Sequence, residues 1–361
     1  MRLAPWLVVM AGMAMGHLAG AQEASSGLDV RATLTVQTVG SKELAEAPRN
    51  GAPMILGGHG VLYPTIKFSD SLYITSALQG VTRPYYYSEL STPGYGVYGR
   101  VLQATLNYSR VSSRGSVLLR AGQMSTAFGS FLLRYDDADN ALVDLPPAYG
   151  YYYAAVSMLG VAGAQLDATT GRFDGRVQFA NSSPANPRSL FAHDQYGNWA
   201  GGGGYTIRQG LRVGASGYRG PYLDRKFPFY FPGEAKPSAL PAYGVGMDAD
   251  WAHGHTRAYA ELQRFVMTYK VIPNFRESAG YGEVKQVLAP RWFVAGRYSY
   301  LSNSVQGVAH TIESTAGFRP NRLQIVKIGY EWHHFRSASR PDENRFAIQL
   351  ITTLHKSLSR D

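Results

Sequence analysis

The chain has 361 residues, of which only 17% are charged, and it contains 40 glycines, 25 tyrosines and no cysteine. The lack of cysteine excludes a disulfide framework, so stability must come from burial and hydrogen bonding. The net charge of +10 could suit nucleic acid, an anionic surface or an anion pathway, but the basic residues are dispersed singly, which argues against a nucleic-acid partner.

The first 21 residues have the features of a secretory signal peptide. Arg2 precedes a short apolar run, LVVMAGMAMG, and the small residues AGA form a cleavage pattern before Gln22. We therefore exclude residues 1–21 from the fold and expect an exported protein whose mature part, residues 22–361, is one large β domain. This part has no apolar stretch of the roughly 18 residues that a spanning helix needs, so it can cross a membrane only as a barrel.

Apolar and polar residues alternate with period two in one segment of the mature chain after another. In VRATLTVQT, for example, Val30 and Leu34 interleave with Arg31 and Thr35. This alternation predicts strands with each face in a different environment. The predicted strands lie near residues 30–38, 60–68, 71–80, 98–110, 114–123, 158–169, 172–181, 196–207, 210–219, 243–252, 255–266, 277–287, 291–301, 307–318, 321–332 and 344–354.

The connections between these segments alternate between tight turns, such as SDS, VSSRG and HGH, and long stretches rich in Pro, Tyr and Gly. Turns on one side and long loops on the other are typical of an outer-membrane barrel. The sequence therefore predicts an all-β protein, a transmembrane antiparallel β-barrel of about 16 strands, with a large periplasmic or secreted β protein as the alternative. The long connections lie around residues 39–59, 81–97, 124–157, 182–195 and 220–242.

Aromatic residues gather near the ends of several predicted strands. Such residues commonly form girdles at the two membrane interfaces of a barrel. The predicted girdle residues are Trp251, Trp292, Tyr298, Tyr300, Tyr330 and Trp332.

An acidic cluster, Asp136, Asp137 and Asp139, stands in the longest connection of an otherwise basic protein. A short run of this kind could be a metal site, a catalytic pair, a solvated surface loop or one wall of a charged passage. As a calcium loop it lacks the glycine and the terminal glutamate of an EF-hand, and nothing pairs its carboxylates with a nucleophile. We therefore predict no metal, no cofactor and no enzymatic activity, and the choice between solvated loop and charged passage stays open.

The segment RAGQMSTAFGSFLLRYD resembles the R-x-G-Q-x-x-x-x-F-G stretch at the end of a porin strand, here Arg120, Gly122, Gln123, Phe128 and Gly129. The strand pattern of nearly the whole mature chain is also similar to that of the sixteen-stranded general and anion-preferring porins of Gram-negative bacteria. This resemblance implies a third outer loop that folds into the barrel and narrows the pore, with acidic loop groups facing basic wall groups. It also implies assembly as a homotrimer.

One departure from the porin pattern lies at the C-terminus. Barrel proteins commonly end on a strand whose last residue is aromatic, whereas this chain continues past ITTL into a polar tail, HKSLSRD, at residues 355–361. The C-terminal aromatic residue that serves as a signal for barrel assembly is therefore missing, although the strand pattern is regular.

If the polar face of each strand faces the lumen, the sequence also predicts which charges line the passage, since a wet interior with both signs makes a selective filter. The predicted pore-lining and constriction residues are Arg31, Arg120, Arg176, Arg212, Arg257, Arg297 and Lys327 on the wall and Asp136, Asp137 and Asp139 on the loop. The same face carries Arg345, Asp167, Asp174, Asp248, Asp250, Glu261, Glu283 and Glu313.

The third loop spans residues 124–157. The best predicted partner of its three aspartates is Arg120, because Arg120 lies at the end of the strand that precedes the loop. The aromatic and proline residues of the loop's return would stiffen it against the wall and set the aperture. These residues are Pro146, Pro147, Tyr151, Tyr152 and Tyr153.

The functional prediction is a water-filled channel in the cell outer membrane for passive diffusion of small hydrophilic solutes, leaning toward anions because the charge is positive. Its expected partners are outer-membrane lipid and the solutes. Two alternatives stay open. A non-channel barrel could act as an adhesin through its long Tyr/Pro-rich loops, and a barrel enzyme acting on lipid would need a serine–histidine arrangement that no motif near a histidine suggests.

Overall fold

The computed structural model describes most of the mature chain. The predicted signal peptide and Tyr151, Tyr152 and Tyr153 lie outside the described residues. The described residues are 27–42, 53–83, 85, 96–150, 160–181, 197–221, 227–236, 239–305, 307–336 and 341–359.

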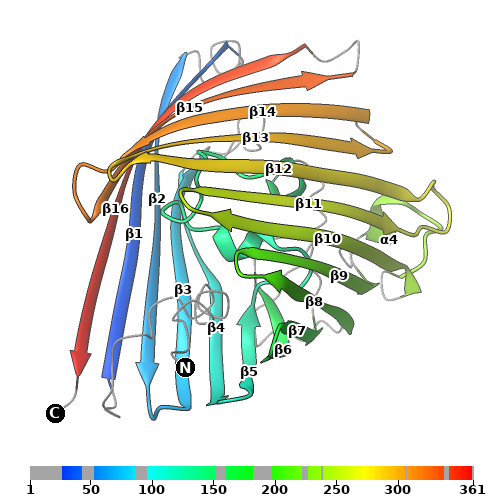
Figure 1. Ribbon diagram of the computed structural model, residues 1–361. Coiled ribbons are helices and arrows are strands. Elements are labelled where there is room, and N and C mark those ends of the chain that lie inside the picture. The colour runs from blue at the N-terminus through cyan, green and yellow to red at the C-terminus, as the bar shows by residue number, and fades with distance from the viewer. Residues whose placement is uncertain are drawn as a thin grey trace.

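All sixteen alternating segments form strands (Figure 1). The first eight are β1 (Gly27–Ser41), β2 (Met54–Lys67), β3 (Leu72–Arg83), β4 (Gly96–Ser112), β5 (Gly115–Met124), β6 (Val161–Thr170), β7 (Phe173–Ala180) and β8 (Asn198–Arg208). The other eight are β9 (Leu211–Pro221), β10 (Pro241–His253), β11 (Thr256–Met267), β12 (Phe275–Ala289), β13 (Trp292–Asn303), β14 (Gly307–Phe318), β15 (Gln324–Phe335) and β16 (Glu343–Ser359). The predicted fold class is therefore confirmed.

The strands form one closed antiparallel barrel in which each strand pairs with its neighbours in sequence. The closure joins β1 to β16 in an unbroken register from Gly27 opposite Ser359 to Ser41 opposite Arg345. Because the sheet closes on itself, no strand is left with an unpaired edge.

The last strand is longer than the sequence pattern predicted. Residues 355–359, expected to belong to a polar tail, continue β16 and pair with β1. Leu354, Lys356 and Leu358 lie on the outer face at this end of β16, and the two leucines are 46% and 49% exposed. The period-two pattern thus persists beyond ITTL, and the prediction that the strand ends at residue 354 was wrong.

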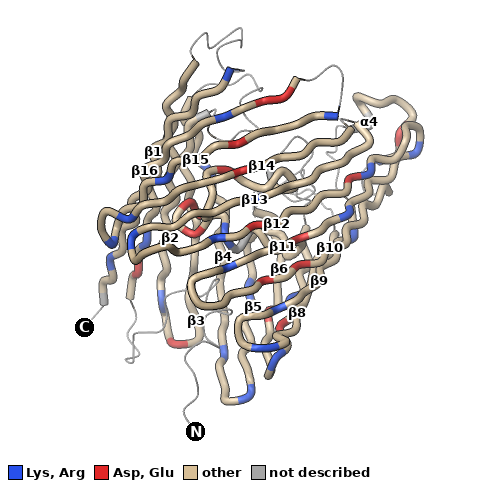
Figure 2. Tube along the Cα trace, turned by 45° about the horizontal axis from the view of Figure 1, so that its top comes forward, with Lys and Arg blue, Asp and Glu red and all other residues tan. Residues whose placement is uncertain are grey.

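The two faces of the barrel have opposite chemistry. The outer face exposes apolar side chains, for example Met247 at 69% and Leu262 at 66%. The inner face is polar, and Gln37, Glu283 and Arg297 on it are almost completely buried. Acidic and basic positions are interspersed along the strands (Figure 2). This arrangement is the inverse of a soluble protein and follows directly from the alternation of side chains along each strand.

Aromatic pairs mark both ends of the outer face. Trp292 and Phe318 lie 4.5 Å apart between ring centroids at the end with the short turns, and Phe179 and Trp199 lie 4.9 Å apart toward the loop end. None of the six predicted girdle aromatics is buried, although Tyr298 and Tyr330 lie nearer the middle of their strands than the prediction implied.

The connections at the turn end are short throughout, but those at the loop end are not all long. After β11, β13 and β15 the connections span only residues 268–274, 304–306 and 336–342. The predicted strict alternation of short turns and long loops therefore fails in this half of the barrel. The physical reason is that β13 and β14 pair up to Asn303 and Gly307, which a tight hairpin can join.

Three short helical turns complete the described elements: η3 (Phe131–Arg134), α3 (Pro147–Gly150) and α4 (Phe227–Tyr230). Within the described ranges, no helix is long and apolar enough to cross a membrane.

Candidate functional site

The chain between β5 and β6 makes extensive contact with the inner face of the barrel. We call residues 125–149 the β5–β6 segment. The inward-facing Lys327 of β15 donates hydrogen bonds from Nζ to the carbonyl oxygens of Asp137 (2.7 Å), Asn140 (2.6 Å) and Leu142 (3.1 Å). These bonds attach the segment to the middle of a strand that lies about 190 residues away in sequence.

Two buried arginines hold the following stretch of the segment. Arg297 of β13 donates to the Asp144 carbonyl at 2.7 Å and pairs with Glu313 at 2.5 Å. Arg345 of β16 lies 3.0 Å from the Asp144 carboxylate and 2.6 Å from Glu331. Burial raises the pKa of Asp144 to about 6 even though the Arg345 charge opposes this. The segment thus shares a charge network with β13 to β16.

The first part of the segment is held by β11 and β12. The backbone N–H and the hydroxyl of Ser130 each donate to Glu261 at 2.9 Å, and Tyr149 donates to the same carboxylate at 2.6 Å. Gly129 has a φ of +83°, and a Cβ there would lie 2.3 Å from the Tyr149 hydroxyl oxygen. Glycine is therefore required where the segment turns against the wall.

Arg134 is a further anchor from the segment side. Its guanidinium donates to Glu283 at 2.8 Å and to the Tyr281 hydroxyl at 2.9 Å, and it stacks 3.5 Å from the centroid of the Tyr259 ring. Sequence reasoning missed this arginine, although it stands only two residues before the acidic cluster. An arginine inside an otherwise acidic loop was the available signal.

The two buried carboxylates of the acidic cluster face β1 and β2. Tyr63 donates to Asp136 at 2.6 Å, and the Arg31 guanidinium lies 3.8 Å from the same carboxylate. His59 contacts Asp137 at 2.8 Å, and Tyr85 donates to it at 3.0 Å. The wall groups that meet these aspartates thus include two tyrosines and a histidine beside Arg31, and a pattern of wall cations alone does not predict them.

The prediction that Arg120 is the partner of the aspartates was wrong. Arg120 instead pairs with Asp167 of the neighbouring strand β6 at 3.1 Å. Asp139, the third aspartate, is exposed and interacts electrostatically with Lys285 of β12. The physical reason is that Asp136 and Asp137 contact residues of β1 and β2, whereas Arg120 belongs to β5, so proximity in sequence does not carry over into space.

We expect the Asp137 carboxylate to contribute to the stability of the fold. Burial would raise its pKa, but the charges of His59 and Lys327 lower it to about 2. In the unfolded chain the Asp137 carboxylate is protonated near pH 4. Above that pH the ionised carboxylate therefore contributes roughly 2 kcal/mol to the unfolding free energy, and this contribution disappears as the pH falls to about 2. We expect Asp137→Asn to lower the unfolding free energy at pH 7 but not at pH 2.

Urea unfolding of the refolded barrel at several pH values measures this difference. Asp139→Asn, which neutralises the exposed neighbour, is the matched control and should give a much smaller effect. An equal loss at pH 7 and pH 2 would contradict an electrostatic origin.

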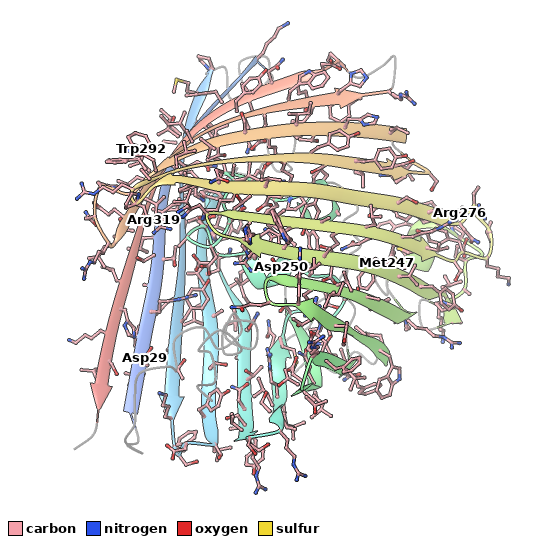
Figure 3. All side chains as sticks on the ribbon, viewed as in Figure 1. Asp29, Met247, Asp250, Arg276, Trp292 and Arg319 are labelled. Carbon is pink, nitrogen blue, oxygen red and sulfur yellow. The ribbon has the colours of Figure 1, made fainter. Side chains whose placement is uncertain are left out.

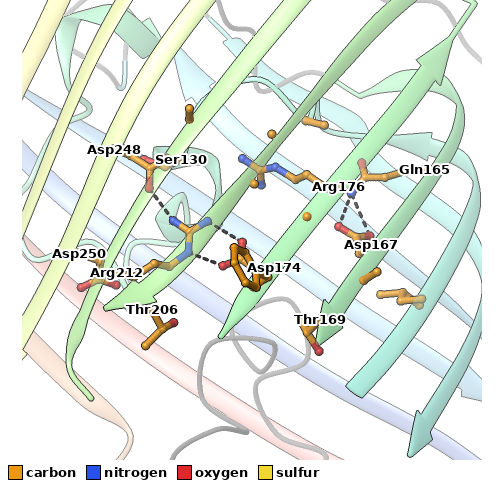
Figure 4. Close-up of a pocket in the computed structure, with 18 of the residues that line it drawn as sticks. Ser130, Gln165, Asp167, Thr169, Asp174, Arg176, Thr206, Arg212, Asp248 and Asp250 are labelled. Carbon is orange, nitrogen blue, oxygen red and sulfur yellow. Dashed lines mark hydrogen bonds and ion pairs between the residues drawn. The ribbon is translucent and has the colours of Figure 1, made fainter. Parts of the chain in front are cut away.

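A cavity of about 240 Å³ lies between the start of the β5–β6 segment and the inner wall from β5 to β11 (Figure 4). Its lining carries six arginines and four aspartates. These are Arg120, Arg134, Arg172, Arg176, Arg212, Arg257, Asp167, Asp174, Asp248 and Asp250.

Most of the cavity's arginines are bound to carboxylates of neighbouring strands. Arg212 bridges Asp174 at 2.6 Å and Asp248 at 2.7 Å, and Arg257 pairs with Asp250 at 2.9 Å. Arg176 differs, because among the described residues its only hydrogen bond goes to the Gly129 carbonyl and no carboxylate lies within ion-pair distance. Arg172 likewise has no carboxylate partner among the described residues, but it is exposed and donates to the Ile207 carbonyl. Arg176 is therefore the least neutralised of the arginines that are not exposed.

The four consecutive glycines 201–204 provide space for this charge arrangement. A Cβ at Gly204 would lie 2.2 Å from the Arg212 guanidinium, and a Cβ at Gly214 would lie 2.7 Å from Asp248. Because β8 presents no side chain there, Arg212 can lie across the strand and reach Asp174. The side chain of Arg212 fills the space that the glycine run leaves on this face.

The predicted wall residues all face inward but fall into two groups. Arg31, Arg297 and Lys327 contact the β5–β6 segment. The other four line the cavity: Arg120, Arg176, Arg212 and Arg257. Sequence reasoning did not single out the other residues of these contacts, which are His59, Tyr63 and Tyr85 outside the segment and Arg134 and Asp144 within it.

No protein-family model matches the chain, and no curated protein matches it significantly. Solved structures do match. The anion-selective porin from Comamonas acidovorans superimposes with a TM-score of 0.62 at 12% identity, covering 92% of this chain and 100% of that one. The outer membrane channel DcaP of Acinetobacter baumannii gives 0.62 at 11% identity, with 93% and 100% covered.

OmpT, an outer membrane protein of Vibrio cholerae in its trimer form, gives 0.59 at 11% identity, with 91% and 100% covered. At these identities the likeness concerns the fold. The protein is therefore a closed sixteen-stranded β-barrel with the fold of the Gram-negative outer-membrane porins.

Proposed function

We propose that the protein is an outer-membrane channel through which small hydrophilic solutes diffuse passively, with anions favoured. The observation that carries this proposal is the polar cavity lined by Arg120, Arg134, Arg176, Arg212 and Arg257 inside a barrel whose outer face is apolar. Passive diffusion requires no cofactor and no catalytic residue. In this proposal residues 1–21 direct export, the short turns face the periplasm and the loops face outward.

We further propose that the β5–β6 segment narrows the passage. Its contacts with β1, β2 and β11 to β16 support this, because a chain attached to that wall occupies part of the cross-section. The cavity beside β5 to β11 is then the remaining path for solutes.

The lean toward anions rests on the balance of charge in this cavity. Its arginines outnumber its aspartates, and Arg176 has no carboxylate partner among the described residues. A surplus of fixed positive charge raises the local concentration of anions, and added salt weakens the effect by screening.

Single-channel recording tests the proposal. Protein recovered from the outer-membrane fraction is inserted into a planar bilayer, and the reversal potential is measured across a salt gradient. We expect large, stable conductance steps with a moderate anion preference that decreases at high salt. Absence of steps from folded, inserted protein would refute a channel.

Replacing Arg176 by Glu is expected to shift the reversal potential toward cation selectivity, because two units of charge change at a half-buried cavity position without a carboxylate partner. Arg110→Glu is the matched control, since Arg110 is exposed near the turn end of β4 and pairs with the outward-facing Val117. An equal shift in both variants would show that Arg176 acts only through the total charge of the protein.

Assembly as a homotrimer is a separate proposal, supported by the resemblance in sequence pattern and by the trimer form of the OmpT barrel. The mass of the protein–detergent complex, measured by light scattering with correction for bound detergent, tests it. A monomeric mass at micromolar protein concentration would contradict the trimer.

An adhesin function has one specific observation in its favour. In α4 of the β9–β10 loop, Phe229 is 83% and Tyr230 is 65% exposed. Glu234 of the same loop accepts backbone N–H bonds from residues 270–272 at 2.6–2.8 Å, which holds the loop in place. If deletion of residues 228–231 abolishes binding of cells to a surface while conductance persists, the barrel has this second function.

A further inference from the structure

The outer face of the barrel carries a row of arginines at the loop end of β9 to β12. Arg219 of β9 lies opposite the outward-facing Trp199 and Tyr243, which are 57% and 42% exposed. Arg264 of β11 lies opposite Val245, which is 61% exposed. Arg276 of β12 lies opposite Val266 of β11, two residues along from Arg264. All three arginines are exposed and point away from the lumen.

The register makes these residues neighbours. Arg264 faces Ser278 on β12, so Arg276 is its diagonal neighbour at a Cα separation of about 7 Å. Tyr243 is in the same diagonal relation to Arg264 and directly opposite Arg219, whose guanidinium lies 5.7 Å from the Tyr243 ring centroid. The row therefore forms one continuous patch about 15 Å wide across four strands.

The side chains of these three arginines make no ion pair or hydrogen bond with any described residue. The outer face of β8 to β12 also carries no Asp or Glu within the strands, because the carboxylates there, Asp248, Asp250, Glu261, Glu277 and Glu283, all face the lumen. The positive charge of the patch is thus left unbalanced by the protein.

The patch lies where the apolar outer face ends. Met247 of β10 and Leu262 of β11 lie farther from the loop end than the patch and are 69% and 66% exposed. Figure 3 shows Arg276 at the loop end of β12 and Met247 nearer the middle of β10. The row of three arginines lies on β9 to β12, and the strands on the opposite side of the barrel lack such a row. Within β16, β1 and β2, the outward positions near the same end are Thr38, Leu56 and Phe346, with no Arg or Lys among them.

We propose that Arg219, Arg264 and Arg276 bind the phosphate groups of lipid headgroups in the outer leaflet. A guanidinium presents two parallel N–H donors that match a phosphate, and the close pair Arg264 and Arg276 can contact one phosphate together. The acyl chains of the same lipid would lie on the apolar surface around Met247 and Leu262, which a free phosphate ion could not use. This inference rests on the proposed outer-membrane location.

Native mass spectrometry of the folded full-length barrel tests the proposal. The protein is taken from detergent into vesicles of phosphatidylcholine with phosphatidic acid, and the lipids that stay bound after release are counted. We expect wild type to retain phosphatidic acid about tenfold over phosphatidylcholine, and the triple variant Arg219→Gln, Arg264→Gln, Arg276→Gln to lose this preference.

The matched control removes the same charge at the turn end, with Arg110→Gln, Arg322→Gln and Lys356→Gln, which are also exposed, and it should retain the preference. A triple variant that retains phosphatidic acid like wild type overturns the proposal, as does a control that loses the preference equally. Inorganic phosphate added in excess should not displace the lipid, and full displacement would show an ion site only. The heat-dependent shift on a detergent gel verifies that each variant is folded.

Single-channel conductance separates this inference from the proposed function. The triple variant should conduct like wild type, because its altered side chains face away from the lumen. A wild-type barrel that retains phosphatidic acid but does not conduct would refute the channel and leave the lipid site standing.

Discussion

Deletion of residues 136–145 is expected to raise the single-channel conductance by a factor of about two, because this stretch fills part of the lumen in the proposed channel. The stretch supplies all three carbonyl acceptors of Lys327 and both Asp144 contacts of the wall arginines. Without it, the lumen opens on the side of β13 to β16. Conductance in a planar bilayer is the measurement, with a folded barrel confirmed by the gel shift.

The matched control shortens a loop that does not contact the inner wall in this way. Deleting residues 228–231 removes the exposed tip of α4 and should leave conductance unchanged. If the longer deletion prevents insertion, Lys327→Met removes the three hydrogen bonds while keeping the chain length, and it should increase the fluctuation of the open current. Wild-type conductance in both the deletion and Lys327→Met would show that the segment does not restrict the path.

Replacement of Arg297 by Met is expected to destabilise the barrel by about 3–5 kcal/mol, the usual cost of leaving a buried charge without its partner. Arg297 and Glu313 are both almost completely buried, and their ion pair at 2.5 Å is completed by a bond from Arg297 to the Asp144 carbonyl. Removing the guanidinium leaves Glu313 with neither water nor a cation. The unfolding free energy from urea titration in micelles gives the effect.

Arg257→Met provides the comparison, because its ion pair with Asp250 is partly exposed and should be worth about 1 kcal/mol or less. The double variant Arg297→Met with Glu313→Gln should regain part of the loss, since it removes the uncompensated charge. Equal losses of unfolding free energy in Arg297→Met and Arg257→Met would mean that burial does not strengthen the Arg297–Glu313 ion pair.

The sequence by itself determined the strands and their faces. Side chains alternate sides with a strict period of two, so the pattern around Val30 and Arg31 already predicts which side chains face outward and which face the interior. The same rule correctly oriented every predicted wall cation from Arg31 to Lys327. It also extends to the end of β16, where Leu354 and Leu358 lie on the outer face, although the polar residues between them suggested a tail.

Only the tertiary structure decided which charges meet. Arg120 is sixteen residues from Asp136 in sequence, yet it pairs with Asp167 across the β5–β6 register, while Asp136 reaches Tyr63 and the backbone of Asp137 reaches Lys327. Closing β1 onto β16 brings strands from both ends of the chain to the same wall, and the β5–β6 segment contacts residues of both ends there. Alternation specifies which face of its own strand a residue occupies. Contacts between distant strands and the β5–β6 segment depend instead on how the barrel closes and on the path of that segment, and the local sequence contains no periodic pattern that predicts either.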